Sequence, residues 1–262
     1  MSMIVGIAGC GRMGAPMLAA LRRANIDVKG FDVIAGRGDD ITITAFKQSL
    51  TTLITVVRDT AETDALLFTD QAMIDAADLR TIIIASTLPP SYVRDLRARV
   101  PAHITLIDAP MSGAQIRAEA GTLSFMLGGA MVDIDAHRHI FDTMGQDIHI
   151  MGQFGDGMAA KVLNNLLAAS STAMTRMVLD WADHAGIPED KLRALIHTSS
   201  GQNWLASGFD DIEFSRDGYA DDNSIGILVK DVAAGLDLAP AGADTTLPVA
   251  VQAMLRQMSP RK

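Results

Sequence analysis

The stretch Ile4-Val5-Gly6-Ile7-Ala8-Gly9-Cys10-Gly11-Arg12-Met13-Gly14 decides the fold. An apolar strand runs directly into Gly9-x-Gly11-x-x-Gly14, a helical pattern follows, and a second short strand ends at Phe31-Asp32. In this context the glycines are typical of a dinucleotide-binding turn: the first allows the tight turn, the second lets the backbone approach a pyrophosphate, and the third lets helix and strand pack closely. The phosphates would meet free N–H groups and the positive end of the helix dipole. A glycine-rich turn without a ligand would leave the strand–helix–strand unit unexplained.

The acidic residue that closes the second strand bears on the choice of cofactor. The carboxylate of Asp32 can accept hydrogen bonds from a ribose diol, and it repels a 2′-phosphate, which favours NAD over NADP. Arg37 is the opposing observation, because an arginine nearby could pair with a 2′-phosphate. Arg37 can equally be a solvated turn residue between Gly36 and Gly38. We therefore expect NAD, with NADP possible.

Composition narrows the class of protein and its partners. The 262 residues suit one large or two modest domains, and a net charge of −9 with a pI near 5.0 argues against nucleic acid or an anionic membrane as the main partner. Cys10 is the single cysteine, so no disulfide framework exists and a reducing compartment is indicated. No signal-peptide pattern opens the chain and no stretch is long and apolar enough to span a bilayer. We expect a cytoplasmic protein.

The pattern along the chain changes at about Gly152. Before it, short apolar runs alternate with helical patterns, which predicts a doubly wound parallel sheet. The expected strands are Met3–Ala8, Asp27–Phe31, Ile41–Ala45, Leu53–Val57, Thr81–Ala85, Ile104–Ile107, Ser124–Leu127 and Asp147–Ile150. After it, the expected helices are Met158–Ala185, one beginning at Pro188, Ser224–Leu238 and Leu247–Gln257. The predicted fold is thus an α/β Rossmann-type domain, residues 1–152, followed by an all-α C-terminal domain, residues 153–262, joined by a long helix.

Two further stretches carry candidate site residues. Ser112 and Gly113 follow a strand, at the edge where open α/β sheets bind ligands, and a hydroxyl with adjacent N–H groups can hold a carboxylate. An ordinary Ser-Gly turn is the other interpretation. Lys161 and Asn165 are four residues apart, so they share one face of the long helix about one turn from its start. Such a lysine is either a snorkelling surface residue or a desolvated catalytic one.

Together these stretches resemble the β-hydroxyacid dehydrogenase family, which includes 3-hydroxyisobutyrate dehydrogenases and tartronate semialdehyde reductases and has a 6-phosphogluconate dehydrogenase-type NAD-binding domain. The resemblance covers nearly the whole chain in ordered motifs. They are Gly9-Cys10-Gly11-Arg12-Met13-Gly14-Ala15-Pro16-Met17, Ser86-Thr87, Asp108-Ala109-Pro110-Met111-Ser112-Gly113, Lys161 with Asn165, and Lys230-Asp231 opening a helix.

The resemblance implies roles for these residues. Lys161 would be the general acid/base of hydride transfer with a small anionic 3-hydroxy acid or semialdehyde, and Asn165 would orient the substrate hydroxyl. Ser112 and Gly113, with Asn165, would bind the substrate. The implied cofactor-binding residues are Gly9, Gly11, Arg12, Met13, Gly14, Asp32, Val57, Thr87 and Lys230.

The sequence also departs from the family pattern. Ala114 stands where a second glycine often follows the Ser-Gly pair, and Arg117 replaces a further loop glycine. Arg117 could bind a second anionic group of an unusual substrate or point to solvent. Val57-Arg58 replaces a Leu-Pro turn near the cofactor, and the segment Asp32–Leu53 is short. The chain also ends soon after Gln257-Met258, where relatives continue through another helix.

The sequence also bears on two other function classes, on metal binding and on the oligomeric state. A non-catalytic nucleotide-binding protein would have little need of Lys161, and imine-reducing relatives on the same scaffold generally lack that lysine. His137 and His139 flank an arginine on a predicted surface helix without ligand spacing, so we expect no metal. The long helix is apolar around much of its circumference, and the absent terminal helix should leave part of it bare. We therefore expect a homodimer.

Overall fold

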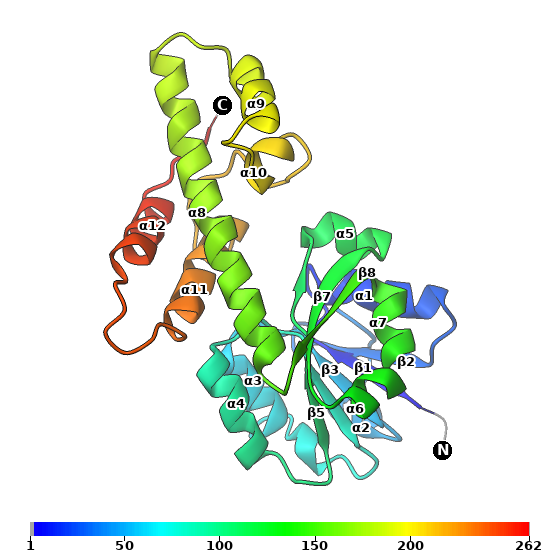
Figure 1. The fold of residues 1–262 in the computed structure, drawn as a ribbon. Helices are drawn as coiled ribbons and strands as arrows, with labels where there is room; N and C mark the ends of the chain where they lie inside the picture. The colour runs from blue at the N-terminus through cyan, green and yellow to red at the C-terminus, as the bar shows by residue number, and fades with distance from the viewer. Residues whose placement is uncertain (1–2, 262) are drawn as a thin grey trace. The chain divides into compact units, whose positions relative to one another are not determined.

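The computed structural model describes residues 3–261 (Figure 1). The chain divides into two compact units, Met1–Lys161 and Val162–Lys262, and the boundary falls within the long helix α8 (Asp156–His184). No helix of the described residues is long and apolar enough to cross a membrane.

The first unit contains one sheet, to which eight strands of the described residues belong. Its first five strands run parallel in the order β2-β1-β3-β4-β5, and then β7 runs antiparallel to β5. Strand β6 pairs antiparallel with β7, and β8 pairs parallel with it. The bounds are Val5–Ala8 (β1), Val28–Phe31 (β2), Thr52–Thr55 (β3), Thr81–Ile84 (β4), Thr105–Asp108 (β5), Met111–Ser112 (β6), Leu123–Gly128 (β7) and Gly145–Gly152 (β8). The parallel, doubly wound prediction is confirmed for the first five strands.

Helices cover both faces of this sheet (Figure 1). Ile7, Ile54 and Ile83 pack on one face against α1, α5, α6 and α7, whereas Leu53 and Ile82 pack on the other against α2, α3 and α4. Burial on both sides explains why these strands are continuous apolar runs rather than alternating ones. The helices are α1 (Gly14–Arg23), α2 (Ile43–Lys47), α3 (Thr60–Leu67), η1 (Met73–Asp75), α4 (Pro90–Arg99), α5 (Ala114–Ala120), α6 (Met131–Ala136) and α7 (Arg138–Met144).

The prediction of a strand at Ile41–Ala45 was wrong, because this segment begins helix α2. The hydroxyl of Thr42 accepts a hydrogen bond from the Ala45 N–H at 3.2 Å, which caps the helix, and Phe46 is fully buried. An N-cap and one anchoring aromatic residue thus outweigh the β-propensity of the isoleucine and threonine residues. The short helix also explains how the brief segment between Asp32 and β3 makes its crossover.

Three smaller differences from the sequence expectations concern the first unit and helix α11 (Ser224–Leu236). The sheet gains β6 and turns antiparallel at β7, so it is not parallel throughout. His137 is buried rather than on a surface helix: its Nδ1 lies 2.8 Å from the Asp133 carbonyl and its Nε2 lies 3.4 Å from the Thr52 hydroxyl. Lys230-Asp231 lies in the middle of α11 and does not open it.

Among its described residues, the second unit contains helices and the loops that connect them, and no strand. Its helices are the later part of α8, α9 (Glu189–Thr198), α10 (Trp204–Ser207), α11 and α12 (Thr246–Arg256). Its main core joins α8, α11 and α12 through Ala169, Val229, Val232 and Leu255. The predicted long helix and the two terminal helices are confirmed within about two residues at each end.

Ala114 adopts a backbone conformation that suits glycine. Its φ is +57° and that of the preceding Gly113 is +133°, so the absent second glycine leaves local strain. We predict that Ala114→Gly raises the free energy of unfolding by about 0.5–1 kcal/mol, since relief of left-handed strain exceeds the entropy that glycine adds to the unfolded chain. Urea denaturation of the two proteins measures this difference. A less stable variant would contradict the prediction.

Candidate active site

The parallel strands bring the candidate cofactor-binding residues to one edge of the sheet. Ala8 is in register with Phe31 and with Thr55, Thr55 with Ile84, and Ile84 with Asp108. All five strands therefore end level with one another. The residues that follow them lie in the spatial order Asp32 after β2, the glycine turn after β1, Val57 after β3, Thr87 after β4 and Asp108 at the end of β5.

The three glycines of the first turn are required for different physical reasons. Gly9 has a φ of +94°, and a β-carbon there would lie 2.5 Å from the Val56 carbonyl oxygen. A β-carbon on Gly14 would lie 1.8 Å from the Gly9 oxygen, so helix α1 approaches β1 as closely as backbone permits. A β-carbon on Gly11 would meet Arg37 Nη1 alone, at 3.8 Å. The protein itself does not need a glycine at position 11, whereas a pyrophosphate against the backbone does.

Asp32 is fixed beside this turn. Its carboxylate accepts hydrogen bonds from the N–H groups of Cys10 and Ile34, both at 2.8 Å, and the side chain remains partly exposed. These contacts aim the carboxylate at the turn, as ribose recognition requires. The closeness of Arg37 to position 11 also places a cation at the same edge. The glycine turn and Asp32 therefore fit an adenine dinucleotide. The preference between NAD and NADP then depends on the opposite charges of Asp32 and Arg37.

The loop after β5 carries the predicted substrate-binding residues. Ser112 ends β6, and Gly113 precedes α5 with a positive φ. The side-chain carbons of Arg117 lie against Gly113, because a β-carbon at position 113 would approach three of them within 2.7–3.1 Å. The Arg117 guanidinium pairs with Asp147 at 2.9 Å on the surface. The guanidinium of Arg117 is thus paired with a carboxylate of the protein, and neither expectation, a solvated side chain or a site for a second anionic group of the substrate, describes it.

Lys161 is buried, with 6% of its surface exposed, although lysine rarely is. It lies on α8 three residues after Met158, whose sulfur accepts a hydrogen bond from the Leu88 N–H at 3.4 Å next to the end of β4. The start of α8 is therefore packed at the carboxyl edge of the sheet. Lys161 lies less than one helical turn after Met158.

Asn165 is held by a buried carboxylate that the sequence analysis gave no role. Asn165 Nδ2 donates to Asp231 Oδ2 at 2.6 Å, with both residues more than 90% buried. Lys230 Nζ lies 3.8 Å from Asp231 Oδ1. Asp231 fixes the rotamer of Asn165 one turn beyond Lys161 on the continuous helix. The signal for this contact was Asp231 itself, an acidic residue between the apolar Val229 and Val232 of an amphipathic helix.

Asp108 is a second buried acid for which the sequence predicted no role. This side chain is fully buried at the end of β5, and burial raises its pKa to about 6, although the N–H groups of Gly155 and Met158 donate to it. Because this pKa lies above the ordinary value of 3.8, the folded state binds the proton more tightly than the unfolded chain does.

We predict a stability difference that follows from this raised pKa. The contribution of Asp108 to the free energy of unfolding is full below pH 4 and falls by about 3 kcal/mol as pH rises to 6. Urea denaturation across pH 4–8 should show this fall in the wild-type protein and lack it in Asp108→Asn. Parallel pH curves for the two proteins would contradict the prediction.

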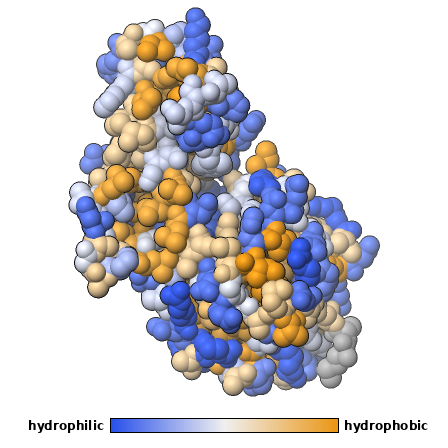
Figure 2. All heavy atoms as spheres, viewed as in Figure 1, coloured by the Kyte–Doolittle hydropathy of each residue, from blue (hydrophilic) through white to orange (hydrophobic). Residues whose placement is uncertain are grey.

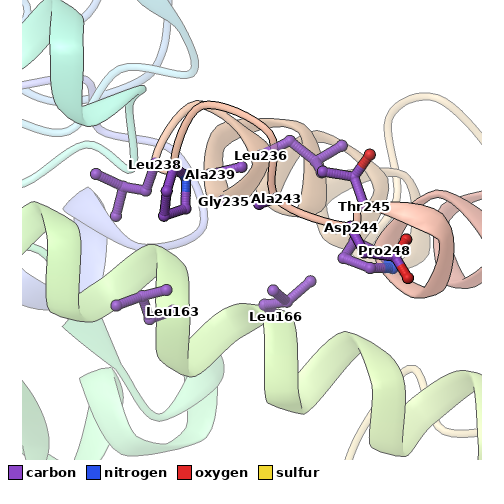
Figure 3. A pocket seen from close by; sticks show the side chains of 11 residues that line it. Leu163, Leu166, Gly235, Leu236, Leu238, Ala239, Ala243, Asp244, Thr245 and Pro248 are labelled. Carbon is purple, nitrogen blue, oxygen red and sulfur yellow. The ribbon is translucent and has the colours of Figure 1, made fainter.

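A shallow apolar hollow of about 140 Å³ lies in the second unit (Figure 3). Leu163 and Leu166 of α8 face Leu236 at the end of α11, Leu238 in the loop that follows it, and Pro248 in α12. None of the candidate site residues lines it. The hollow is therefore separate from the candidate active site.

Comparison with known families agrees with this arrangement. Residues 4–152 match the NAD-binding domain of 6-phosphogluconate dehydrogenase, and residues 155–261 match the NAD-binding domain of NADP-dependent 3-hydroxyisobutyrate dehydrogenase. The chain belongs to the β-hydroxyacid dehydrogenase family. As a member of this family it is an NAD(P)-dependent hydroxyacid dehydrogenase.

Individual relatives match over most of both chains. An NAD-dependent L-serine dehydrogenase of Pseudomonas aeruginosa is 26% identical, over 92% of this chain and 87% of its own. A 3-hydroxyisobutyrate dehydrogenase of the same organism is 28% identical, over 91% and 85%. The solved structure of Mycobacterium tuberculosis 3-hydroxyisobutyrate dehydrogenase with L-serine superposes with a TM-score of 0.79 at 25% identity, covering 99% of this chain and 97% of that one.

Proposed function

We propose that the protein transfers hydride between NAD and a small 3-hydroxy acid or the corresponding semialdehyde, with Lys161 as general acid/base. The observation that carries this proposal is the burial of Lys161 one turn into a helix whose start is packed at the carboxyl edge of the sheet. A lysine that merely solubilised the surface would be exposed.

Each residue then has a distinct task. The bound dinucleotide supplies or accepts the hydride. Lys161 takes the proton of the substrate hydroxyl during oxidation and returns it during reduction, so that no alkoxide is left unprotonated. Asn165, held by Asp231, orients the substrate hydroxyl. The Ser112 hydroxyl and the backbone N–H at Gly113 bind the substrate carboxylate.

A spectrophotometric panel tests the proposal. Small 3-hydroxy acids, with L-serine and 3-hydroxyisobutyrate first because relatives are named for them, are offered with NAD and with NADP. The matching semialdehydes are offered with the reduced cofactors, and cyclic imines serve as the comparison class. We expect turnover of a 3-hydroxy acid. Tight NADH binding without turnover of any member would support a non-catalytic nucleotide-binding protein, and turnover of imines alone would support an imine reductase.

The surface of α8 supports a homodimer. Leu163, Leu167, Met174 and Trp181 are 52–71% exposed, and their spacing at 100° per residue places them on one face of the helix. The buried Asn165 and the other buried polar residues of α8 lie on the opposite face. Figure 2 shows apolar side chains gathered over α11, α12 and the adjacent part of α8. An apolar stripe of this length on an exposed helix is typical of a subunit contact.

We predict that Leu167→Glu combined with Trp181→Glu converts the homodimer to monomers. Two charges in the middle of an apolar interface cost several kcal/mol of association energy. Light scattering at micromolar concentration compares this variant with the wild type and with Leu195→Glu, an equally exposed apolar position on α9. A wild-type protein that is monomeric at every concentration would contradict the proposed dimer.

A further inference from the structure

A buried carboxyl group joins the end of β5 to the first turn of α8. Asp108 Oδ1 accepts a hydrogen bond from the Gly155 N–H at 2.7 Å, and Oδ2 accepts one from the Met158 N–H at 2.5 Å. Helix starts normally obtain such acceptors from a residue immediately before the helix. Here the acceptor precedes its partners by 47 and 50 residues, so the cap is a tertiary contact between sheet and helix.

The surroundings of this carboxyl group admit no other side chain. A β-carbon on Gly128 would lie 2.2 Å from Asp108 Oδ1, and one on Gly157 would lie 2.9 Å from Oδ2 and 2.3 Å from the Met126 carbonyl oxygen. Strand β7 and the first turn of α8 therefore close directly over the carboxylate. The helix cannot slide or rotate here without breaking one of the two hydrogen bonds.

Lys161 lies close to this junction, since it follows Met158 by three residues on the same helix. We propose that Asp108 is a positioning residue: its carboxylate holds the first turn of α8 on the end of β5 and so sets where the Lys161 ammonium lies along the strand edge. The inference rests on the proposed role of Lys161. It also gives the Asp of the Asp108-Ala109-Pro110-Met111-Ser112-Gly113 motif a task of its own, separate from substrate binding by Ser112 and Gly113.

The charges around Asp108 predict how the cap responds to pH. Asp156, in the first turn of α8, raises the pKa of Asp108 beyond the effect of burial, and Arg94 of α4 lies 3.6 Å from Asp156. Protonation of Asp108 places a hydroxyl opposite one backbone N–H, and the carboxyl then has one good acceptor oxygen for two donors. The first turn of α8 should loosen as pH falls through about 6.

The test compares Asp108→Asn with Asp156→Asn. The amide keeps the size of Asp108 but presents an NH₂ group to one of the two donors at every pH. We expect kcat to fall roughly 10- to 100-fold, as for a misplaced catalytic group. The Kd for NADH should stay within about threefold, and the acid limb of the kcat profile near pH 6 should disappear. Asp156→Asn removes a charge from the same helix start without touching the β5 contact, so its kcat should stay within about threefold.

A kcat within twofold of wild type and an unchanged acid limb in Asp108→Asn would overturn the proposal. A second measurement on the wild-type protein does not depend on the variant folding or on activity. The ¹⁵N and amide proton shifts of Gly155 and Met158 should titrate together with a midpoint near pH 6. Shifts that stay constant between pH 5 and 8 would equally overturn it. Full activity of a Lys161 variant would instead refute the proposed function, with the shift titration still reporting on the cap.

Discussion

Replacing Lys161 with alanine is expected to lower kcat by roughly two to four orders of magnitude, the usual contribution of a positioned acid/base. The proton of the substrate hydroxyl would then have no acceptor as hydride leaves the same carbon. The Kd for NADH should change little, because the glycine turn and Asp32 lie at other strands of the sheet. Fluorescence titration of NADH and steady-state kinetics with the best substrate of the panel measure the two quantities separately.

Two companion variants make this result interpretable. Lys161→Met keeps the aliphatic volume of a side chain that is 94% buried, so a loss of activity in a folded Met variant reports on the amine. Lys191→Ala removes an exposed lysine from α9 and should retain wild-type kcat. Ordinary turnover in Lys161→Met would remove Lys161 from the mechanism.

The elements of the fold that could be predicted from the sequence are those whose conformation depends on residues close to them in the chain. Gly14 is constrained by the Gly9 oxygen within one strand–turn–helix unit, and Gly9 has the positive φ that such a turn requires, so the motif alone sufficed to place them. The helix at Ile43–Lys47 was missed because its apolar residues favour strand, while its stability comes from a Thr42 cap and the burial of Phe46 by distant residues. The antiparallel edge at β7 was missed because alternating strands and helices carry no information on the direction of a strand that follows a seven-residue helix.

The same distinction applies to the candidate site. Lys161 and Asn165 could be proposed from the sequence because they share a helix face and match a family motif. Asp108 and Asp231 act through partners 47 to 66 residues away, and no periodicity relates such positions. A partial signal existed for Asp108: an acid closing a buried strand, and glycines at positions 155 and 157 opening the long helix. Two glycines at a helix start leave room for an acceptor that comes from elsewhere in the fold.

Cofactor preference is the second large effect that we expect. Asp32 lies beside the glycine turn with its carboxylate fixed by the N–H groups of Cys10 and Ile34. A 2′-phosphate would meet this charge at close range, and a like-charge contact of this kind costs several kcal/mol in a partly desolvated site. We therefore expect NADPH to bind at least about 100-fold more weakly than NADH. Arg37 lies near Gly11 and lowers this ratio, but it does not reverse it, because two backbone N–H groups hold the Asp32 carboxylate at the turn.

Fluorescence titration of both reduced cofactors against three variants separates these two charges. Asp32→Ser removes the repulsion but keeps a hydroxyl for the ribose, so NADPH affinity should rise by at least tenfold while NADH affinity falls. Arg37→Ala should weaken NADPH alone, and Asp40→Asn, a charge change on the same loop, should alter neither affinity by more than about twofold. Equal or tighter binding of NADPH by the wild-type protein would mean that Arg37 dominates the edge of the site and that the preference inferred from Asp32 is wrong.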